Sequence, residues 1–561
     1  IIKLASAWIA DHILIKELFL MKNIIVKTLL TASFVASFTS CSLNDDWLSL
    51  NDPNRETANT FWKTTQQFDQ GLSAAYSTWR RPGYFSRWFQ VLMILRSDEG
   101  WSESPNTEFQ ADANFIISAY NYDGNAGISL PWQTIYNSLY YVNQVIDNMN
   151  STGYKLFSKE EADHILGQGY FIRGVAFWSI AGIYGTGPIQ TSSTENGPIG
   201  TQEELYKQAL EDFTKASTLL PINWPTEEKG RVTKGGALGM MARLNMQLAG
   251  IKCHRPWDAA NQDLEGAKAY WQAAKKNIED IFALGIYRLC DNWMDNFTES
   301  NENNSESLFE INFKDGLING NEVGSQRPKF LGLYLSDGSG AWNDGSSRAW
   351  LLDEFNKERD KDGNVDMRKF HTLFYYDPAE PQTGTANYYG KTWPEWCAVE
   401  GYRDNQFPHE CYWKKYTSVE TDNKNEDYSS GANLRVLRLA DIYLMYAECI
   451  NELNGDRSTA VEYINKVRRR VNMADLTPTS FSTYEELMEQ IKHERVVELC
   501  GECTRWFDLD RWGDLHSQSK INEIAERDAD FRNFKVGINH LWIIPNHEIN
   551  LWKGLTQNPG Y

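Results

Sequence analysis

Apolar residues recur every three or four positions over long stretches of the first half of the chain, a spacing that predicts α-helices. Gly, Pro, Ser and Thr separate these stretches, as is typical of turns between helices. Six helices are predicted, over residues 62–79, 132–149, 160–184, 201–220, 233–248 and 266–284. Consecutive helices joined by short turns form helical hairpins, so we expect a mainly α fold.

The same periodicity returns near the C-terminus. The segment LRLADIYLMYAECINELNGDRSTAVEYINKVRRR predicts one helix over 437–453 and a second over 458–471, with Gly455 and Asp456 at the turn between them. Ala447 is small enough to let the two helices approach closely where they cross. The pair resembles a tetratricopeptide-type hairpin, although no strict repeat period runs through the chain.

Between residues 287 and 434 the helical periodicity is lost. Segments such as GLYLSDGSGAWNDGSSRAW are rich in Gly, Asn, Asp, Ser, Trp and Tyr. A region of this length without regular structure inside a compact domain is typically functional. We therefore expect it to carry the ligand-binding surface.

The beginning of the chain has the pattern of an export signal. Met21 is followed by a short basic segment and by a mostly apolar stretch over 28–38, which predicts a secretory signal peptide over 21–40. Residues 1–20 have the character of translated upstream sequence or a mis-called start. We exclude them from the predicted fold.

Small residues directly before Cys41 resemble a bacterial lipobox, which predicts lipid attachment at Cys41. Phe38 departs from the Leu usual at that position, and cleavage by an ordinary signal peptidase is the alternative. Asp45 and Asp46 resemble the acidic signals that send such lipoproteins to the outer face of the outer membrane. Acyl chains on Cys41 would anchor the protein without a spanning helix.

A dense motif of charged and aromatic residues lies at 491–513. The segment IKHERVVELCGECTRWFDLDRWG places Glu and Arg three or four residues apart, where opposite charges meet on one helix face. Trp, Phe and Leu then follow in a cluster. Charges of this density among aromatic residues are typical of buried ion pairs between packed helices. We therefore expect the motif to stabilise the fold and not to bind a ligand.

The pattern I-x-x-E-R-x-x-E-L-x-x-E-x-x-R-W-F-D-L-x-R-W within this motif resembles the C-terminal motif of the SusD/RagB family, the surface glycan-binding lipoproteins of Bacteroidetes. Further segments resemble family motifs in the expected order along the chain: YFIRGVAFWSIAGIYGTGPI, GRVTKGGALGMMARLNMQLAG and the closing LWIIPNHEINLWKGLTQNPGY. Together with the lipoprotein start, these segments span nearly the whole chain.

The resemblance implies a SusD-like fold, with one domain over 41–561. In it we expect a helical part over 55–286, a loop-rich ligand-binding insertion over 287–434 and a second helical part over 435–561. The resemblance further implies a lipid-anchored protein of the outer membrane that faces the cell exterior. Such a protein binds an oligosaccharide or polysaccharide without catalysis and delivers it to a SusC-like TonB-dependent transporter. Which glycan it binds is left open.

Charge and cysteine content exclude some other classes. The first 40 residues carry four Lys against two acidic residues, so the remainder is more acidic, at −22, than the whole chain at −20. This balance argues against nucleic acid and anionic lipid as ligands. Seven Cys follow Cys41 at irregular spacing, which is no disulfide framework. Cys500 and Cys503 form a C-x-x-C, and we expect buried helix residues there and not a redox or zinc site.

Two loop segments combine aromatic rings with polar side chains. A flat aromatic ring covers the C–H face of a sugar, while Asp, Asn and Arg hydrogen-bond its hydroxyl groups. The segment 96–109 follows a helix end with no obvious core partner for its Trp, and the second segment is Gly-rich. The predicted glycan-binding residues are Asp98, Trp101, Tyr334, Trp342, Asn343, Asp344 and Arg348.

A weaker third set comprises Trp393, Trp396 and Tyr402. No catalytic residue, metal site or cofactor is predicted. The acidic segment 360–366 has its Gly too early for an EF-hand, and Asp366 with Arg368 resembles a structural D-x-R pair of the family.

Two other function classes fit the composition. A glycoside hydrolase needs two carboxylates about 5 to 9 Å apart in a cleft, and a chain with 75 Asp and Glu residues offers many pairs. A helical-repeat scaffold that binds peptides or proteins would present a long groove lined by helix faces. An aromatic, loop-built surface favours sugar over both.

Overall fold

A computed structural model describes residues 61–102, 104, 107–116, 126–255, 262–314, 316–318, 321–332, 341–375, 395, 411–416 and 430–561. The chain divides into two units, Ile1–Thr64 and Thr65–Tyr561, and every element below belongs to the second. The predicted signal peptide and Cys41 lie outside the described residues. Each helix of the described part is too short or too polar to cross a membrane.

Among the described residues, six long helices lie in the N-terminal part of this unit, close to where the hydrophobic periodicity predicts them. They are α2 (Thr65–Ser77), α5 (Ala126–Ser151), α6 (Lys159–Ile183), α7 (Gln202–Leu219), α8 (Lys234–Cys253) and α9 (Leu264–Ala283). Capping boxes set the starts of two of them. The side chains of Ser158 and Thr201 accept from the backbone N–H groups of Glu161 and Glu204, whose carboxylates accept in return from the cap backbone.

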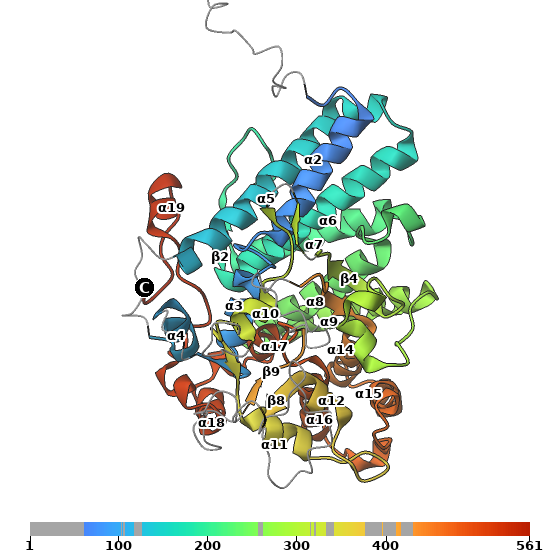
Figure 1. Cartoon of the computed structure of the whole chain (residues 1–561), viewed down its shortest axis with the longest axis vertical. Helices are drawn as coiled ribbons and strands as arrows, with labels where there is room; N and C mark the ends of the chain where they lie inside the picture. Colours follow the sequence, from blue (N-terminus) through green and yellow to red (C-terminus); the bar gives the residue numbers. More distant parts are fainter. Residues whose placement is uncertain are drawn as a thin grey trace, which may run out of the picture. The chain divides into compact units, whose positions relative to one another are not determined.

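Consecutive helices of this part pack against one another, α5 on α6, α6 on α7, α7 on α8 and α8 on α9. Figure 1 shows α2, α5 and α6 lying side by side along their lengths. Gly174 of α6 permits one close approach, because a Cβ atom there would lie 3.0 Å from the Phe213 ring of α7. The predicted packing of neighbouring helices is confirmed.

The predicted C-terminal hairpin is present as α14 (Leu439–Glu452) and α15 (Arg457–Arg470). The turn between them places Asn454 in the left-handed region at φ 50°, and the Asp456 side chain caps α15 by accepting from two backbone N–H groups. Ala447 is fully buried. α14 packs on α9 and on α16 (Tyr484–Leu499), the helix that begins the charged motif.

A tight turn follows α16 and leads into α17 (Arg505–Arg511). Its backbone has Gly501 at φ 75° and Cys503 at φ 64°. Cys500 and Cys503 are buried and carry free thiols, as predicted for a structural pair. The expectation that they lie in a helix is wrong, because α16 ends at Leu499 and the left-handed residues turn the chain.

The charged residues of the motif are buried in a network of ion pairs, as predicted. The Glu498 carboxylate is fully buried and accepts from Arg368 at 2.9 Å and Arg438 at 2.5 Å, and it also contacts Arg470. Burial alone would raise the pKa of Glu498, but these three guanidinium groups hold it well below its usual range. We call the network the ionic lock; its members are Glu306, Asp366, Arg368, Arg438, Arg468, Arg470, Glu494, Glu498 and Glu502.

The lock ties segments that are far apart in sequence. Arg368 pairs with Asp366 at 2.6 Å, so the D-x-R pair is structural as predicted. Arg438, at the end of β10, also reaches Glu306 at 3.0 Å and Glu502 at 2.7 Å, which joins the irregular middle to the turn between α16 and α17. Each such buried charge has a partner, which is the condition for burying it without a large cost.

The remaining elements of the described residues are short. The antiparallel strand pairs are β1 (Gly100–Trp101) with β7 (Ser346–Ser347), β2 (Thr186–Pro188) with β3 (Ile199–Thr201), β4 (Ser307–Ile311) with β10 (Leu434–Arg438), β5 (Leu317–Ile318) with β6 (Asn321–Glu322), and β8 (Leu373–Tyr375) with β9 (Cys411–Trp413). The shorter helices are α3 (Trp88–Leu95), α4 (Thr107–Asn114), α10 (Arg327–Leu331), α11 (Trp350–Asn356), α12 (Met367–Thr372), α18 (Gln518–Arg527) and α19 (Asn546–Leu551). The 3-10 turns are η3 (Thr78–Arg80), η5 (Gly153–Lys155), η6 (Thr226–Glu228), η8 (Trp293–Asn296), η9 (Glu299–Asn301), η10 (Pro478–Ser480), η11 (Asp514–His516) and η12 (Ala529–Asn533).

Candidate functional site

The β1–β7 pair brings the two predicted glycan-binding segments together. Trp101 of β1 lies opposite Ser346 of β7. The Trp101 indole N–H donates to the carbonyl oxygen of Ser347, which is 246 residues away in the chain, at 3.1 Å. The two predicted segments are separate in the sequence, and the structure joins them through this strand pair.

Trp342, which comes shortly before β7 in the chain, lies at the protein surface with 43% of the residue exposed. Its backbone N–H donates to the Lys329 carbonyl of α10 at 2.7 Å, and the N–H of Asp344 donates to the Phe330 carbonyl at 2.6 Å. Between them Asn343 adopts a left-handed φ of 51°. This short turn is therefore fixed on α10 while its indole stays accessible.

Two cations lie close to the Trp342 ring. The Arg87 guanidinium is 4.7 Å from the ring centroid and the Lys329 ammonium is 4.6 Å from it. Both distances are within the range of cation–π attraction, so the two cations orient the indole. They also supply hydrogen-bond donors beside the ring, which suit sugar hydroxyl groups.

A buried carboxylate anchors Arg87. Asp344 Oδ2 lies 3.1 Å from Arg87 Nη2, and Ser104 Oγ donates to Asp344 Oδ1 at 2.7 Å. Burial raises the pKa of Asp344, although Ser104 and Arg87 act against that rise. Arg87, Ser104, Lys329, Trp342, Asn343 and Asp344 together are called the Trp342 surface below.

The expectation that Trp101 has no core partner is wrong. The residue is 7% exposed, its indole N–H is used within the β1–β7 pair, and Arg348 lies 5.9 Å from its ring. Strand pairing turns the side chain inward, which the local sequence did not indicate. The Trp101 ring therefore packs inside the protein beneath the β1–β7 pair and is not available to a ligand.

Asp98 and Arg348 are also committed to the fold. Asp98 is fully buried between Arg505, at 2.7 Å, and Arg527, at 2.5 Å. Burial alone would raise the pKa of Asp98, but these two guanidinium groups hold it well below its usual range. Arg348 pairs with Asp528 at 2.8 Å and contacts Asp530. Asp98 has no exposed surface to offer a glycan, so its predicted contact is wrong. Arg348 is partly exposed, and its contact with glycan stays a prediction.

Other predicted residues fall beyond the described part of the chain, namely Tyr334, Trp393, Trp396 and Tyr402. In turn, Arg87, Ser104 and Lys329 were not predicted. Ser104 lies inside the segment 96–109 that the sequence singled out. Arg87 lies far before Trp342 in the chain and Lys329 lies closer to it, but no local sequence pattern links either residue to Trp342. Across the described ranges, no three His, Cys, Asp or Glu side chains are arranged to hold a metal ion.

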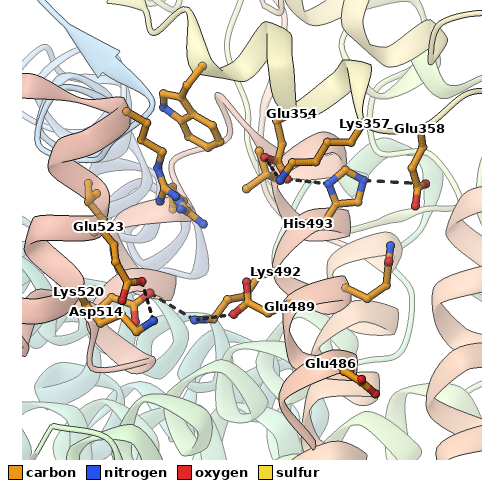
Figure 2. A pocket seen from close by; sticks show the side chains of 16 residues that line it. Glu354, Lys357, Glu358, Glu486, Glu489, Lys492, His493, Asp514, Lys520 and Glu523 are labelled. Atoms are coloured by element: carbon orange, nitrogen blue, oxygen red, sulfur yellow. Dashed lines mark hydrogen bonds and ion pairs between the residues drawn. The ribbon is translucent and has the colours of Figure 1, made fainter. Parts of the chain in front are cut away.

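A second feature is a charged cavity of about 430 Å³ between α11, α16 and α18. Figure 2 shows Glu354, His493 and Glu358 along one wall, and Lys492 reaching across toward the opposite wall. His493 lies 2.6 Å from Glu354, and Lys492 lies 3.4 Å from Asp514. We call it the charged pocket.

The charged pocket offers little to a sugar ring. Its Trp350 has the Arg527 guanidinium 4.6 Å from the ring centroid, and its indole N–H donates to the Asp98 carbonyl. Glu354 is held by His493 and by Lys357, at 2.7 Å. Trp350 is less exposed than Trp342, its indole N–H is bonded within the protein, and Glu354 is already paired, so the Trp342 surface is the stronger candidate for binding.

Two family models match consecutive parts of the chain. The model described as the SusD family matches residues 292–561, and the one described as starch-binding associating with outer membrane matches residues 46–246. The chain belongs to the SusD family. This confirms the family that the C-terminal motif indicated.

Known SusD-like proteins align with most of the chain. A SusD-like protein of Formosa agariphila is 27% identical over 523 residues, which cover 88% of this chain and 90% of that protein. A SusD superfamily crystal structure from Bacteroides vulgatus superposes with a TM-score of 0.73 at 24% identity, covering 90% of this chain and 100% of that one. Surface glycan-binding protein A of Bacteroides thetaiotaomicron, in complex with laminarihexaose, gives a TM-score of 0.68 at 19% identity, covering 88% and 100%. These superpositions confirm the mainly α SusD fold.

Proposed function

We propose that this SusD family protein binds an oligosaccharide or polysaccharide at the Trp342 surface, without chemical change, and delivers it to a TonB-dependent transporter of the outer membrane. The observation that carries the proposal is the exposed indole of Trp342, which lies on a fixed turn with two cations close to its ring. A flat ring beside hydrogen-bond donors suits a sugar, which has a C–H face and a rim of hydroxyl groups.

The names of related proteins support a glycan ligand. One structural neighbour was solved with laminarihexaose, another is called a laminarin binding SusD-like protein, and one matching family model is described as starch-binding. A rigid surface of modest size also suits a carrier, because a ligand held only by one ring and a few hydrogen bonds is readily released to a transporter.

The experiment that tests the proposal is affinity gel electrophoresis with a panel of neutral polysaccharides of different linkage. We expect wild-type protein to be retarded by at least one of them and Trp342→Ala to lose most of that retardation. Tyr154→Ala is the matched control, because Tyr154 is also an exposed aromatic residue, at 54%, but lies in η5. Equal retardation of Trp342→Ala and wild type would place the binding elsewhere.

One carboxylate of the charged pocket, Glu354, is unsuited to act as a general acid. Burial alone would raise the pKa of Glu354, but His493 and Lys357 lower it to about 2, so Glu354 stays ionised at neutral pH. A glycoside hydrolase needs a carboxylic acid that is protonated when the sugar binds. We expect no new reducing ends when the protein is incubated with the glycan that retards it; their appearance would reinstate the hydrolase alternative.

We place the membrane anchor at Cys41, after removal of the signal peptide. Acylation of one cysteine by several chains holds a soluble domain at a membrane, since each buried methylene contributes about 0.8 kcal/mol. In a bacterial host, Cys41→Ala is expected to move the protein from the membrane fraction to the soluble fraction. Unchanged fractionation of that variant would argue against the anchor.

A further inference from the structure

Two cavities flank one short segment of the chain, residues 229–231. One of about 310 Å³ and one of about 480 Å³ share the lining residues Lys229, Gly230 and Arg231. These volumes are within the range of ligand sites. Neither cavity shares a lining residue with the charged pocket or with the Trp342 surface. We call the pair the Lys229 cleft.

The smaller cavity contains an arginine without a counterion. Arg80, at the end of η3, lines it and is partly buried, yet no carboxylate or carbonyl pairs with it among the described residues. Burial lowers the pKa of Arg80, with no carboxylate to offset that change. By contrast, the buried arginines of the ionic lock form ion pairs with carboxylates. A desolvated guanidinium left unpaired is costly, so the missing acceptor points to a partner from outside the chain.

The neighbouring charges leave Arg80 available. Arg231 is already held by Asp69 at 2.9 Å and by Glu228 at 3.7 Å. Lys229 is exposed and has no ion pair within the described ranges, and Glu227 lies exposed on the same rim. Arg80 and Lys229 are therefore two cations of one cavity that a ligand oxyanion can reach.

The larger cavity has the lining of a saccharide site. Trp224 and Tyr287 are both partly exposed and supply aromatic surface. The Trp224 ring is fixed, because its indole N–H donates to the Val232 carbonyl at 2.8 Å. The side chains of Asn223 and Ser307 line the same cavity without a hydrogen-bond partner in the described part of the chain. Fixed rings beside free amide and hydroxyl groups suit the two faces of a sugar.

We propose that the Lys229 cleft is a second saccharide site, and that it takes an acidic sugar chain. The oxyanion of the sugar, a carboxylate or a sulfate ester, pairs with Arg80 and Lys229, while neighbouring sugar rings occupy the larger cavity beside Trp224 and Tyr287. The whole chain carries a net charge of −20, which repels acidic polymers. A local pair of unpaired cations is what lets such a polymer bind in spite of that repulsion, and binding there does not depend on Trp342.

The test is affinity gel electrophoresis with four acidic polysaccharides. Polygalacturonate and alginate carry carboxylates, whereas carrageenan and dextran sulfate carry sulfate esters, so the gels that retard the protein identify the oxyanion. We expect retardation of wild type by at least one of the four. Arg80→Gln should weaken it about tenfold, and raising the salt from about 0.05 M to about 0.5 M should weaken it as well. Arg532→Gln is the matched control, because Arg532 is an exposed arginine of η12 outside the cleft.

Lys229→Gln is a second test variant, at an exposed position where the substitution should not disturb folding. It is expected to weaken retardation by a smaller factor than Arg80→Gln. Trp342→Ala should keep its retardation by acidic polysaccharides while losing that by neutral ones, so the two sites fail independently. The proposal is overturned if none of the four polymers retards wild type. It is equally overturned if Arg80→Gln and Lys229→Gln both match wild type, or if Trp342→Ala abolishes retardation by the acidic polymers.

Discussion

In the ionic lock, Glu498 is surrounded by three arginines and has no exposure to solvent, whereas at the Trp342 surface Asp344 has one arginine, Arg87, whose side chain stays 18% exposed. The pKa values move in opposite directions as a result. Despite burial, the arginines lower that of Glu498, while burial raises that of Asp344. Pairs of a carboxylate with arginine thus occur in both regions, but they are fully buried in the ionic lock and leave the Arg87 side chain partly exposed at the Trp342 surface.

The two tryptophans repeat this contrast at shorter range. Trp101 has its indole N–H bonded inside a strand pair, while Trp342, on a turn that leads into the same pair, keeps its ring at the surface. What distinguishes the two tryptophans is exposure: Trp101 is 7% exposed and its indole N–H is bonded within the fold, while 43% of Trp342 is exposed. The predictions below change one region at a time.

The largest effect is expected in the lock. Glu498→Gln leaves the guanidinium groups of Arg368, Arg438 and Arg470 without their shared carboxylate, and the free energy of unfolding should fall by about 3–5 kcal/mol. Urea denaturation measures it. Glu462→Gln is the matched control, since its pair with Arg469 is exposed and should change stability by less than about 1 kcal/mol. Equal stability of the two variants would mean that the lock does not hold the fold.

A comparable loss of stability is expected for Trp101→Ala. Removal of a buried Trp side chain leaves a cavity and typically costs about 3–5 kcal/mol. Trp342→Ala removes an exposed ring and should stay within about 0.5 kcal/mol of wild type. Thermal unfolding of the two variants side by side checks the ranking, and the reverse order would overturn the assignment of the buried role to Trp101.

A pH dependence should arise from Glu99, which is buried beside the lock and accepts from the Gly501 N–H at 3.1 Å. Burial raises the pKa of Glu99 from 4.5 to about 8. A raised folded-state pKa contributes stability that is fully present below 4.5 and is lost as the pH rises toward about 8. Glu99→Gln removes that titration, so its unfolding midpoint should vary less than that of wild type across this window. Identical pH profiles would contradict the shift.

A smaller effect is expected for Asp344→Asn, which removes the charge that anchors Arg87 but leaves Ser104 an acceptor oxygen. Loss of one such interaction costs about 0.5–1.5 kcal/mol, so affinity for the neutral glycan should fall by about threefold to tenfold. Titration calorimetry measures this. An unchanged affinity would show that the position of Arg87 does not matter to binding.

Much of the fold could be predicted from the sequence, because long helices such as α6 and α7 show an apolar period and clear polar caps. For α3 the sequence indicated only a helix end before residue 96 and not the extent of the helix, since every one of its residues is buried and no apolar–polar alternation remains to be seen. The Trp342 surface was only half predictable. Trp342 and Asp344 are local to one Gly-rich segment, but Arg87 and Ser104 reach them by tertiary contacts more than 200 residues apart in sequence. Strand pairing of β1 with β7, too short to leave a pattern, decided that Trp101 is buried.

The most direct test of the account measures glycan affinity and the free energy of unfolding on the same preparation of Trp342→Ala, with the neutral polysaccharide that retards wild type most. We expect affinity to fall at least tenfold, about 1.4 kcal/mol, while the free energy of unfolding stays within about 0.5 kcal/mol of wild type. An affinity equal to that of wild type in a protein of unchanged stability would contradict the claim that Trp342 carries the binding.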